Sequence, residues 1–124
     1  MGSNPINLGI RFLLELAALA SLGLWGWHSG GSETWLQYIL AIGIPVLAAL
    51  IWGVFNVLGD PSRSGKAPVK VPGIVRLVIE LAFFSIASWG LFDLGNTTLS
   101  LTLVGVVVVH YLVSYDRVLW LIKQ

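Results

Sequence analysis

The chain has 124 residues, of which 56% are hydrophobic and 10% are charged, and its formal net charge is +1. Soluble domains carry about 25% charged residues, so this composition cannot cover a water-facing surface and most of the chain must face lipid. The absence of cysteine excludes disulfides, thiolate metal sites and cysteine nucleophiles.

Four apolar stretches follow one another along the chain, each long enough to cross a hydrocarbon core of about 30 Å as a helix. They span residues 8–27, 35–58, 74–93 and 98–120. The first stretch precedes three more and has no small-residue cleavage site, so we interpret it as a retained span and not as a signal peptide. The sequence therefore predicts an all-α membrane protein, a single domain of four transmembrane helices.

The first two spans are joined by a short glycine-rich turn. Trp25 and Trp27 come just before it, and indoles followed by glycine and serine are typical of a membrane exit. The second span is uncharged and contains Gly43 and Pro45 near its middle. Because proline removes a backbone donor, we expect the helix to be kinked or loosened there. Packing relief is one explanation, and a hinge or a ligand-facing carbonyl is the other.

The loop over residues 59–73 is rich in proline, serine, glycine and lysine, so we expect it to be irregular and exposed to water. It also carries part of a complete charge bias, because every basic residue falls in or next to this loop or near one of the two chain ends. These residues are Arg11, Arg63, Lys66, Lys70, Arg76, Arg117 and Lys123. By the positive-inside rule, the loop and both termini are predicted to be cytoplasmic.

One short motif occurs twice. Arg11 and Glu15 lie four residues apart in an apolar run, and Arg76 and Glu80 repeat this arrangement 65 residues later. Each half of the chain then contains two spans, so both halves enter the membrane from the same side. The sequence predicts two related helical hairpins, a parallel internal repeat about an axis along the membrane normal.

The two acids lie six or seven residues into their spans, roughly 10 Å from the cytoplasmic boundary at about 1.5 Å per residue. A pair within one helix would have the base before the acid, which is the less favourable order. We therefore expect the pairs to cross between the halves, Arg11 with Glu80 and Arg76 with Glu15. A buried clamp is one interpretation of the motif, and a proton or ion relay through Glu15, Glu80 and His110 is the other.

The candidate binding residues share this inner layer of the membrane. They are Glu15, Glu80, His110, Arg11, Arg76 and Asn56. No catalytic residue is assigned, because no nucleophile elbow or phosphate-binding glycine loop is present. No metal set is assigned either, since the spacings typical of histidine–glutamate metal sites are missing, and no cofactor is evident. His28 lies at the opposite membrane face from His110, which leaves bis-histidine haem ligation open only between two chains.

Several motifs together resemble the YrdB-like family, small bacterial membrane proteins with four predicted spans and a domain of unknown function. The motifs are Asn4-Pro5, the Arg11–Leu16 sequence RFLLEL, Trp52-Gly53-x-Phe55, Asp60-Pro61-Ser62-Arg63 and Arg76-Leu77-x-x-Glu80-Leu81. The resemblance implies a multi-pass protein of the bacterial inner membrane. It supplies no activity, substrate or site residues.

Two kinds of function fit these observations. The first is a non-enzymatic membrane protein, an accessory or small transporter-like module whose inner-leaflet polar cluster binds an ion, a proton or a lipid head group. The alternative is a membrane enzyme or redox component that uses His110, Glu15 and Glu80 as acid–base groups or metal ligands. The expected partners are membrane lipids and further copies of the chain, because 124 residues leave little interior for a transport path. The few basic loop residues suit lipid phosphate, and no nucleic acid is expected.

Overall fold

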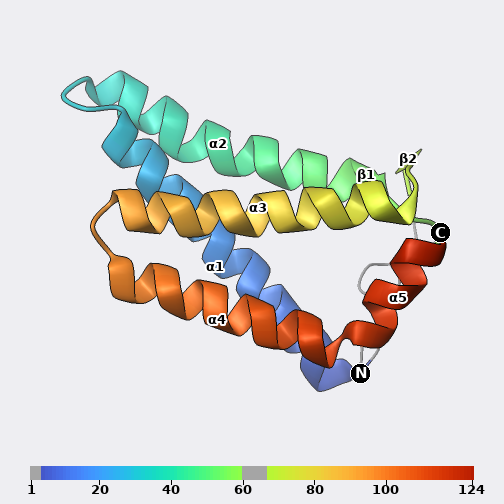
Figure 1. Cartoon of the computed structure of the whole chain (residues 1–124). Coiled ribbons are helices and arrows are strands. Elements are labelled where there is room, and N and C mark those ends of the chain that lie inside the picture. Colours follow the sequence, from blue (N-terminus) through green and yellow to red (C-terminus); the bar gives the residue numbers. More distant parts are fainter. Residues whose placement is uncertain (1–3, 60–66) are drawn as a thin grey trace.

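The computed structural model describes residues 4–59 and 67–124, and within them the chain is almost entirely helical (Figure 1). The five helices are α1 (Pro5–Ser29), α2 (Thr34–Val54), α3 (Gly73–Asp93), α4 (Thr97–Val113) and α5 (Tyr115–Lys123). Two short strands, β1 (Phe55–Asn56) and β2 (Val69–Lys70), pair in parallel between α2 and α3. The predicted all-α class is confirmed. Of the predicted 59–73 loop, residues 60–66 lie outside the described residues.

The helices run back and forth between two ends of the bundle. The turns that join α1 to α2 and α3 to α4 lie at the left of Figure 1. Both termini, the two strands and α5 lie at the right, so the N-terminus and the C-terminus share one end of the bundle. This arrangement places the N-terminal halves of α1 and α3, with their arginine–glutamate motifs, toward the same end.

Close contact between α1 and α2 depends on glycine. A Cβ atom at Gly26 would collide with the backbone carbonyl of Leu40, and one at Gly30 would lie 2.6 Å from Gln37. Small residues of this kind let two helix backbones approach closely inside a membrane. Helix α2 continues through Pro45, so the proline at which we expected a kink or loosening does not end the helix.

The apolar core lies along α3, which packs against α1, α4 and α5. Its buried side chains come mainly from α1 and α3, with two from α4 and only Trp52 from α2. They are Leu14, Ala18, Leu22, Trp52, Phe83, Phe84, Ala87, Leu91, Leu103 and Val107. Helix α2 is therefore attached to the bundle along α1 and at Trp52, and most of its surface faces outward.

The last predicted span is two helices and not one. Helix α4 ends at Val113, and α5 begins at Tyr115 after a bend of 71°. No glycine or proline marks this break. It is held instead by the packing of α5 on the first turn of α3, where Gly73 has no side chain and the backbone of Leu121 occupies the space.

The surface of the bundle is apolar over most of its length. In the described part of the chain, α1, α2 and α3 are each long and apolar enough to cross a membrane, and α4 with α5 could form a fourth span if the bent pair is counted as one. Leucine, isoleucine and valine side chains point outward from all of these helices. Exposure on this scale is costly in water, which indicates lipid as the surroundings.

Candidate functional site

The carboxylate of Glu80 lies at the centre of a buried polar cluster. The guanidinium of Arg117 donates to both of its oxygens, at 3.0 and 2.7 Å. Arg76 Nε donates to Oε2 at 2.8 Å, and the Tyr111 hydroxyl donates to Oε1 at 2.7 Å. Arg11 Nη2 lies 3.0 Å from Oε1. Since a carboxylate offers about four lone-pair positions, these contacts occupy all of them.

Arg76 also connects this cluster to the end of α2. Its Nη1 donates to the backbone carbonyls of Trp52 and Phe55, at 2.6 and 2.9 Å. These carbonyls belong to the last turn of α2 and the residue after it, where helix carbonyls have no partner within the helix. Asn56 has a similar role, because its Nδ2 donates to the carbonyl of Gly53 at 2.6 Å. The cluster therefore ties the end of α2 to α3.

Arg11 connects the two copies of the motif. Its Nε lies 3.3 Å from Oε1 of Glu15, and its Nη2 contacts Glu80. The guanidinium carbon lies 5.1 Å from the ring centre of Trp52 and 5.7 Å from that of Tyr111. Among the described residues, Nη1 of Arg11 has no hydrogen-bond partner, so the aromatic faces supply its closest stabilisation. Side chains from α1, α3, α4 and α5, and carbonyls from α2, all meet in this one cluster.

Glu15 differs from Glu80 in its surroundings. The Glu15 side chain is 14% exposed, whereas that of Glu80 is fully buried. Glu15 lines a small cavity of about 180 Å³ together with Leu19, Ala49, Trp52 and Phe83. A carboxylate on a cavity wall can exchange a ligand without the bundle coming apart.

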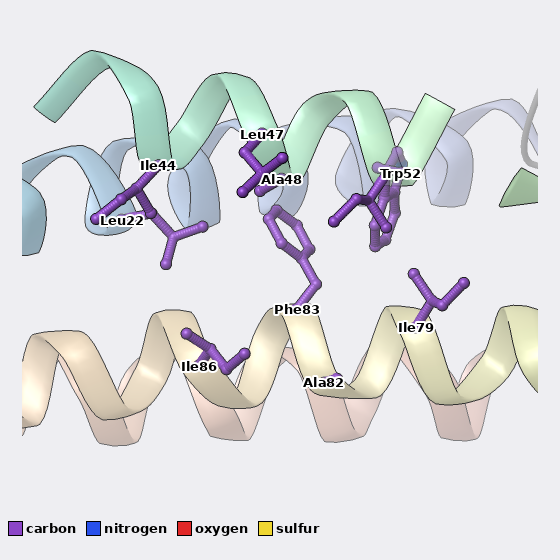
Figure 2. Close-up of a pocket in the computed structure, with 10 residues that line it drawn as sticks. Leu22, Ile44, Leu47, Ala48, Trp52, Ile79, Ala82, Phe83 and Ile86 are labelled. Carbon is purple, nitrogen blue, oxygen red and sulfur yellow. The ribbon is translucent and has the colours of Figure 1, made fainter. Parts of the chain in front are cut away.

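A larger apolar groove adjoins this cavity. It has a volume of about 280 Å³, lies between α2 and α3, and shares Trp52 and Phe83 with the cavity at Glu15. Figure 2 shows Phe83 projecting from α3 toward α2, beside Trp52. The groove exists because α2 and α3 hardly touch each other.

His110 belongs to a separate buried network. Its Nδ1 lies 3.1 Å from Oδ1 of Asn7, and Nδ2 of Asn7 donates to the Ser114 hydroxyl at 2.6 Å. Because an amide oxygen only accepts hydrogen bonds, His110 Nδ1 carries the proton of this contact. The network fastens the start of α1 to the bend between α4 and α5. It gives His110 a satisfied structural role.

The structure places the predicted site residues as follows. The predicted contact between Arg11 and Glu80 is present. Arg76, expected to pair with Glu15, binds Glu80 on its own helix, and Arg11 also contacts Glu15 on its own helix. The unfavourable order of charges along a helix is worth only about 0.2–0.5 kcal/mol, so burial with several partners outweighs it.

Two members of the cluster were not among the predicted binding residues. Arg117 and Tyr111 reach Glu80 from α5 and α4. In the sequence they stand out only as a charged and a phenolic side chain in the cytoplasmic half of the last apolar stretch. Within residues 4–59 and 67–124, His110 hydrogen-bonds to Asn7 and Asn56 to the carbonyl of Gly53, so these two predicted residues lie outside the cluster at Glu80. No group of three or more histidine, aspartate or glutamate side chains among residues 4–59 and 67–124 is arranged to hold a metal ion.

Comparison with known proteins places the chain in a family. Residues 9–108 match the family described as "Protein of unknown function (DUF2568)". The chain belongs to the DUF2568 family. It is also 39% identical over 121 residues to "Uncharacterized protein YrdB" of Bacillus subtilis (strain 168), which covers 98% of this chain and 97% of that protein. No solved structure matches.

The DUF2568 match includes both copies of the arginine–glutamate motif and ends before Tyr111 and Arg117. The relative extends over nearly the whole chain, α5 included, and its length agrees with that of this chain. The resemblance to YrdB-like proteins seen in the sequence motifs is therefore confirmed as family membership. Family membership adds no activity, so the function has to be argued from the geometry.

Proposed function

We propose that this chain is a non-enzymatic integral protein of the bacterial inner membrane, a small transporter-like or accessory module that binds a proton or a small cation at Glu15. In this proposal Glu80 is a fixed structural anion. The observation that carries it is the contrast between the two acids, because Glu15 is part-exposed on a cavity and Glu80 is enclosed by its donors.

The contacts of Glu80 argue against exchange at that residue. A ligand would have to displace the forked pair with Arg117 and leave buried guanidinium groups without their carboxylate. Breaking a buried ion pair in this way costs about 3–5 kcal/mol. A carboxylate that is this costly to release holds the helices together and is poorly suited to bind and release a ligand.

Glu15 is suited to bind and release a proton or a small cation. Arg11 orients its carboxylate from one side, and the cavity of about 180 Å³ gives access from the other. The adjoining groove between α2 and α3 is lined by apolar side chains and separates this cavity from the opposite end of the bundle. A transport path would need movement of α2 relative to α3, and the scarcity of contact between these helices favours it.

The arrangement in the membrane follows from the charges. All seven basic residues fall near the chain ends, between α2 and α3 or in the first turn of α3, and both termini lie at one end of the bundle. The positive-inside rule makes this end cytoplasmic. The doubled motif supports an origin of the two hairpins as a parallel repeat. Membrane lipids and a second copy of the chain are the proposed partners.

The proposal is tested in proteoliposomes that contain a pH-sensitive dye. A proton gradient, and in separate samples a sodium or potassium gradient, is imposed across vesicles with the wild-type chain or with Glu15→Gln. Glu33→Gln is the matched control, since Glu33 is exposed at the start of α2. We expect flux in the wild type and in the control, and a loss of at least tenfold in Glu15→Gln. Equal flux in Glu15→Gln and the control, or none above that of empty vesicles, would overturn the proposal.

A further inference from the structure

We propose that α5 lies in the plane of the inner membrane interface, and that the apolar recess between α3, α4 and α5 receives an acyl chain of an inner-leaflet phospholipid. The inference depends on insertion of the bundle in a membrane and is independent of any role of Glu15. It begins from the bend of 71° between α4 and α5. If α4 crosses the membrane, a helix at this angle runs along the surface.

One face of α5 is fixed to the bundle. Arg117 forms the forked pair with Glu80, and Leu121 is completely buried against the start of α3, where Gly73 makes room for its backbone. These two residues are four positions apart and share a face of the helix. The orientation of α5 about its own axis is therefore fixed.

The outward face of α5 is apolar. Tyr115, Leu119 and Ile122 are spaced as i, i+4 and i+7, and they are 64%, 52% and 56% exposed. Leaving this stripe in water would be unfavourable at about 25 cal/mol for each Å² of apolar surface. A short helix with one apolar face and a charged end is typical of segments that lie in a membrane interface.

The recess is continuous with this face. It has a volume of about 460 Å³, within the range of small-molecule sites, and its walls come from three helices. They include Leu77 and Leu81 of α3, Val108 and Leu112 of α4, and Val118 and Leu119 of α5. Tyr111 and Tyr115 also line it, and the hydroxyl of Tyr111 is already bonded to Glu80. Apart from the Tyr115 hydroxyl, the lining is apolar, and hydrocarbon suits it.

The end of α5 carries side chains that suit the head group of the lipid. Lys123 is exposed at the end of α5, and Trp120 is part-exposed beside it. A cation and an indole at the interface suit the phosphate and glycerol region of a phospholipid. An acyl chain in the recess would place its head group at the level of this end of α5. A second copy of the chain would bring more apolar helix but no phosphate for Lys123.

The experiment measures the phospholipid that the purified full-length chain retains after incorporation into dioleoyl phosphatidylglycerol vesicles and extraction in mild detergent, by native mass spectrometry. Val108→Trp fills the recess. Val106→Trp is the matched control, because Val106 is also an exposed valine of α4 but does not line the recess. We expect one retained lipid per chain in the wild type and control, and at least a tenfold loss in Val108→Trp.

Leu112→Trp, at a strongly exposed lining position, provides a second recess-filling variant if Val108→Trp does not fold. Equal lipid retention in the filled and control variants would overturn the inference. A wild-type chain that is dimeric, with only the recess-filling variants monomeric, would overturn it too, since a second copy of the chain would then occupy the recess.

The chain has no cysteine, so a fluorophore on Leu119→Cys reports the position of α5. We expect it to be quenched by spin-labelled lipid more strongly than one on Lys123→Cys. Equal quenching would contradict the interfacial placement.

Discussion

The two copies of the arginine–glutamate motif have the same spacing and different surroundings. Glu80 is enclosed by three arginines and a tyrosine, whereas Glu15 shares Arg11 with it and faces a cavity. Arg117 from α5 completes the set of donors around Glu80, whereas Glu15 lies beside Trp52 on the cavity wall.

Substitution of Glu80 tests the difference between the two acids most directly. Glu80→Gln removes the charge at similar volume and leaves three buried guanidinium groups without their shared carboxylate. We expect the free energy of unfolding to fall by about 3–5 kcal/mol, measured by denaturant titration in detergent micelles and followed by tryptophan fluorescence. Glu33→Gln serves as the control. Equal stability of the two variants would contradict the role of Glu80 as a clamp.

Arg117→Lys tests the contact that distinguishes the two sites. Lysine keeps the charge but cannot form the forked pair with both oxygens of Glu80. We expect a loss of about 1.5–3 kcal/mol and faster amide hydrogen exchange over residues 115–123 than in the wild type. Lys123→Gln, on the same helix, should leave exchange unchanged. If α5 exchanges equally in both variants, Arg117 does not hold this helix in place.

Tyr111→Phe removes a single donor from Glu80. Since the arginines remain, we expect a loss of about 1 kcal/mol in the free energy of unfolding. Tyr115→Phe deletes the same atom from an exposed tyrosine and should change stability by less. Thermal unfolding of the two variants in the same detergent measures the difference. If Tyr115→Phe lost more stability than Tyr111→Phe, the contact between Tyr111 and Glu80 would not contribute to stability.

Glu15→Gln should have the smallest effect on stability. Arg11 keeps its contact with Glu80 when Glu15 loses its charge, so we expect the unfolding curve to stay close to that of Glu33→Gln. A loss as large as that of Glu80→Gln would make Glu15 a second clamp. The proposed difference between the two acids would then disappear.

Much of the fold could be predicted from composition and pattern. The apolar stretches predicted helices close to α1, α2 and α3, and the doubled motif predicted the contact between Arg11 and Glu80. The break before α5 could not be predicted, because residues 113–115 contain no glycine or proline and the bend depends on tertiary packing against Gly73. Local sequence preference is overridden by such contacts.

The candidate site was predictable only in part, for a related reason. Arg117 is 37 residues from Glu80, so no local spacing joins them. Symmetry between the halves suggested two equivalent crossed pairs, whereas Arg76 contacts Glu80 on its own helix and the ring of Trp52 lies against both Arg11 and Arg76. The part exposure of Glu15 depends on how α2 packs, which the sequence of α1 alone does not contain.

Infrared difference spectroscopy of the carboxylate groups tests the central claim most directly. The wild-type chain, Glu15→Gln and Glu80→Gln are compared in nanodiscs while the cation concentration is varied, with Glu33→Gln as the control. We predict a cation-induced carboxylate difference band that is lost in Glu15→Gln and persists in the control and in any Glu80→Gln protein that remains folded. A band that persists in Glu15→Gln and is lost in Glu80→Gln would contradict the assignment of the two acids.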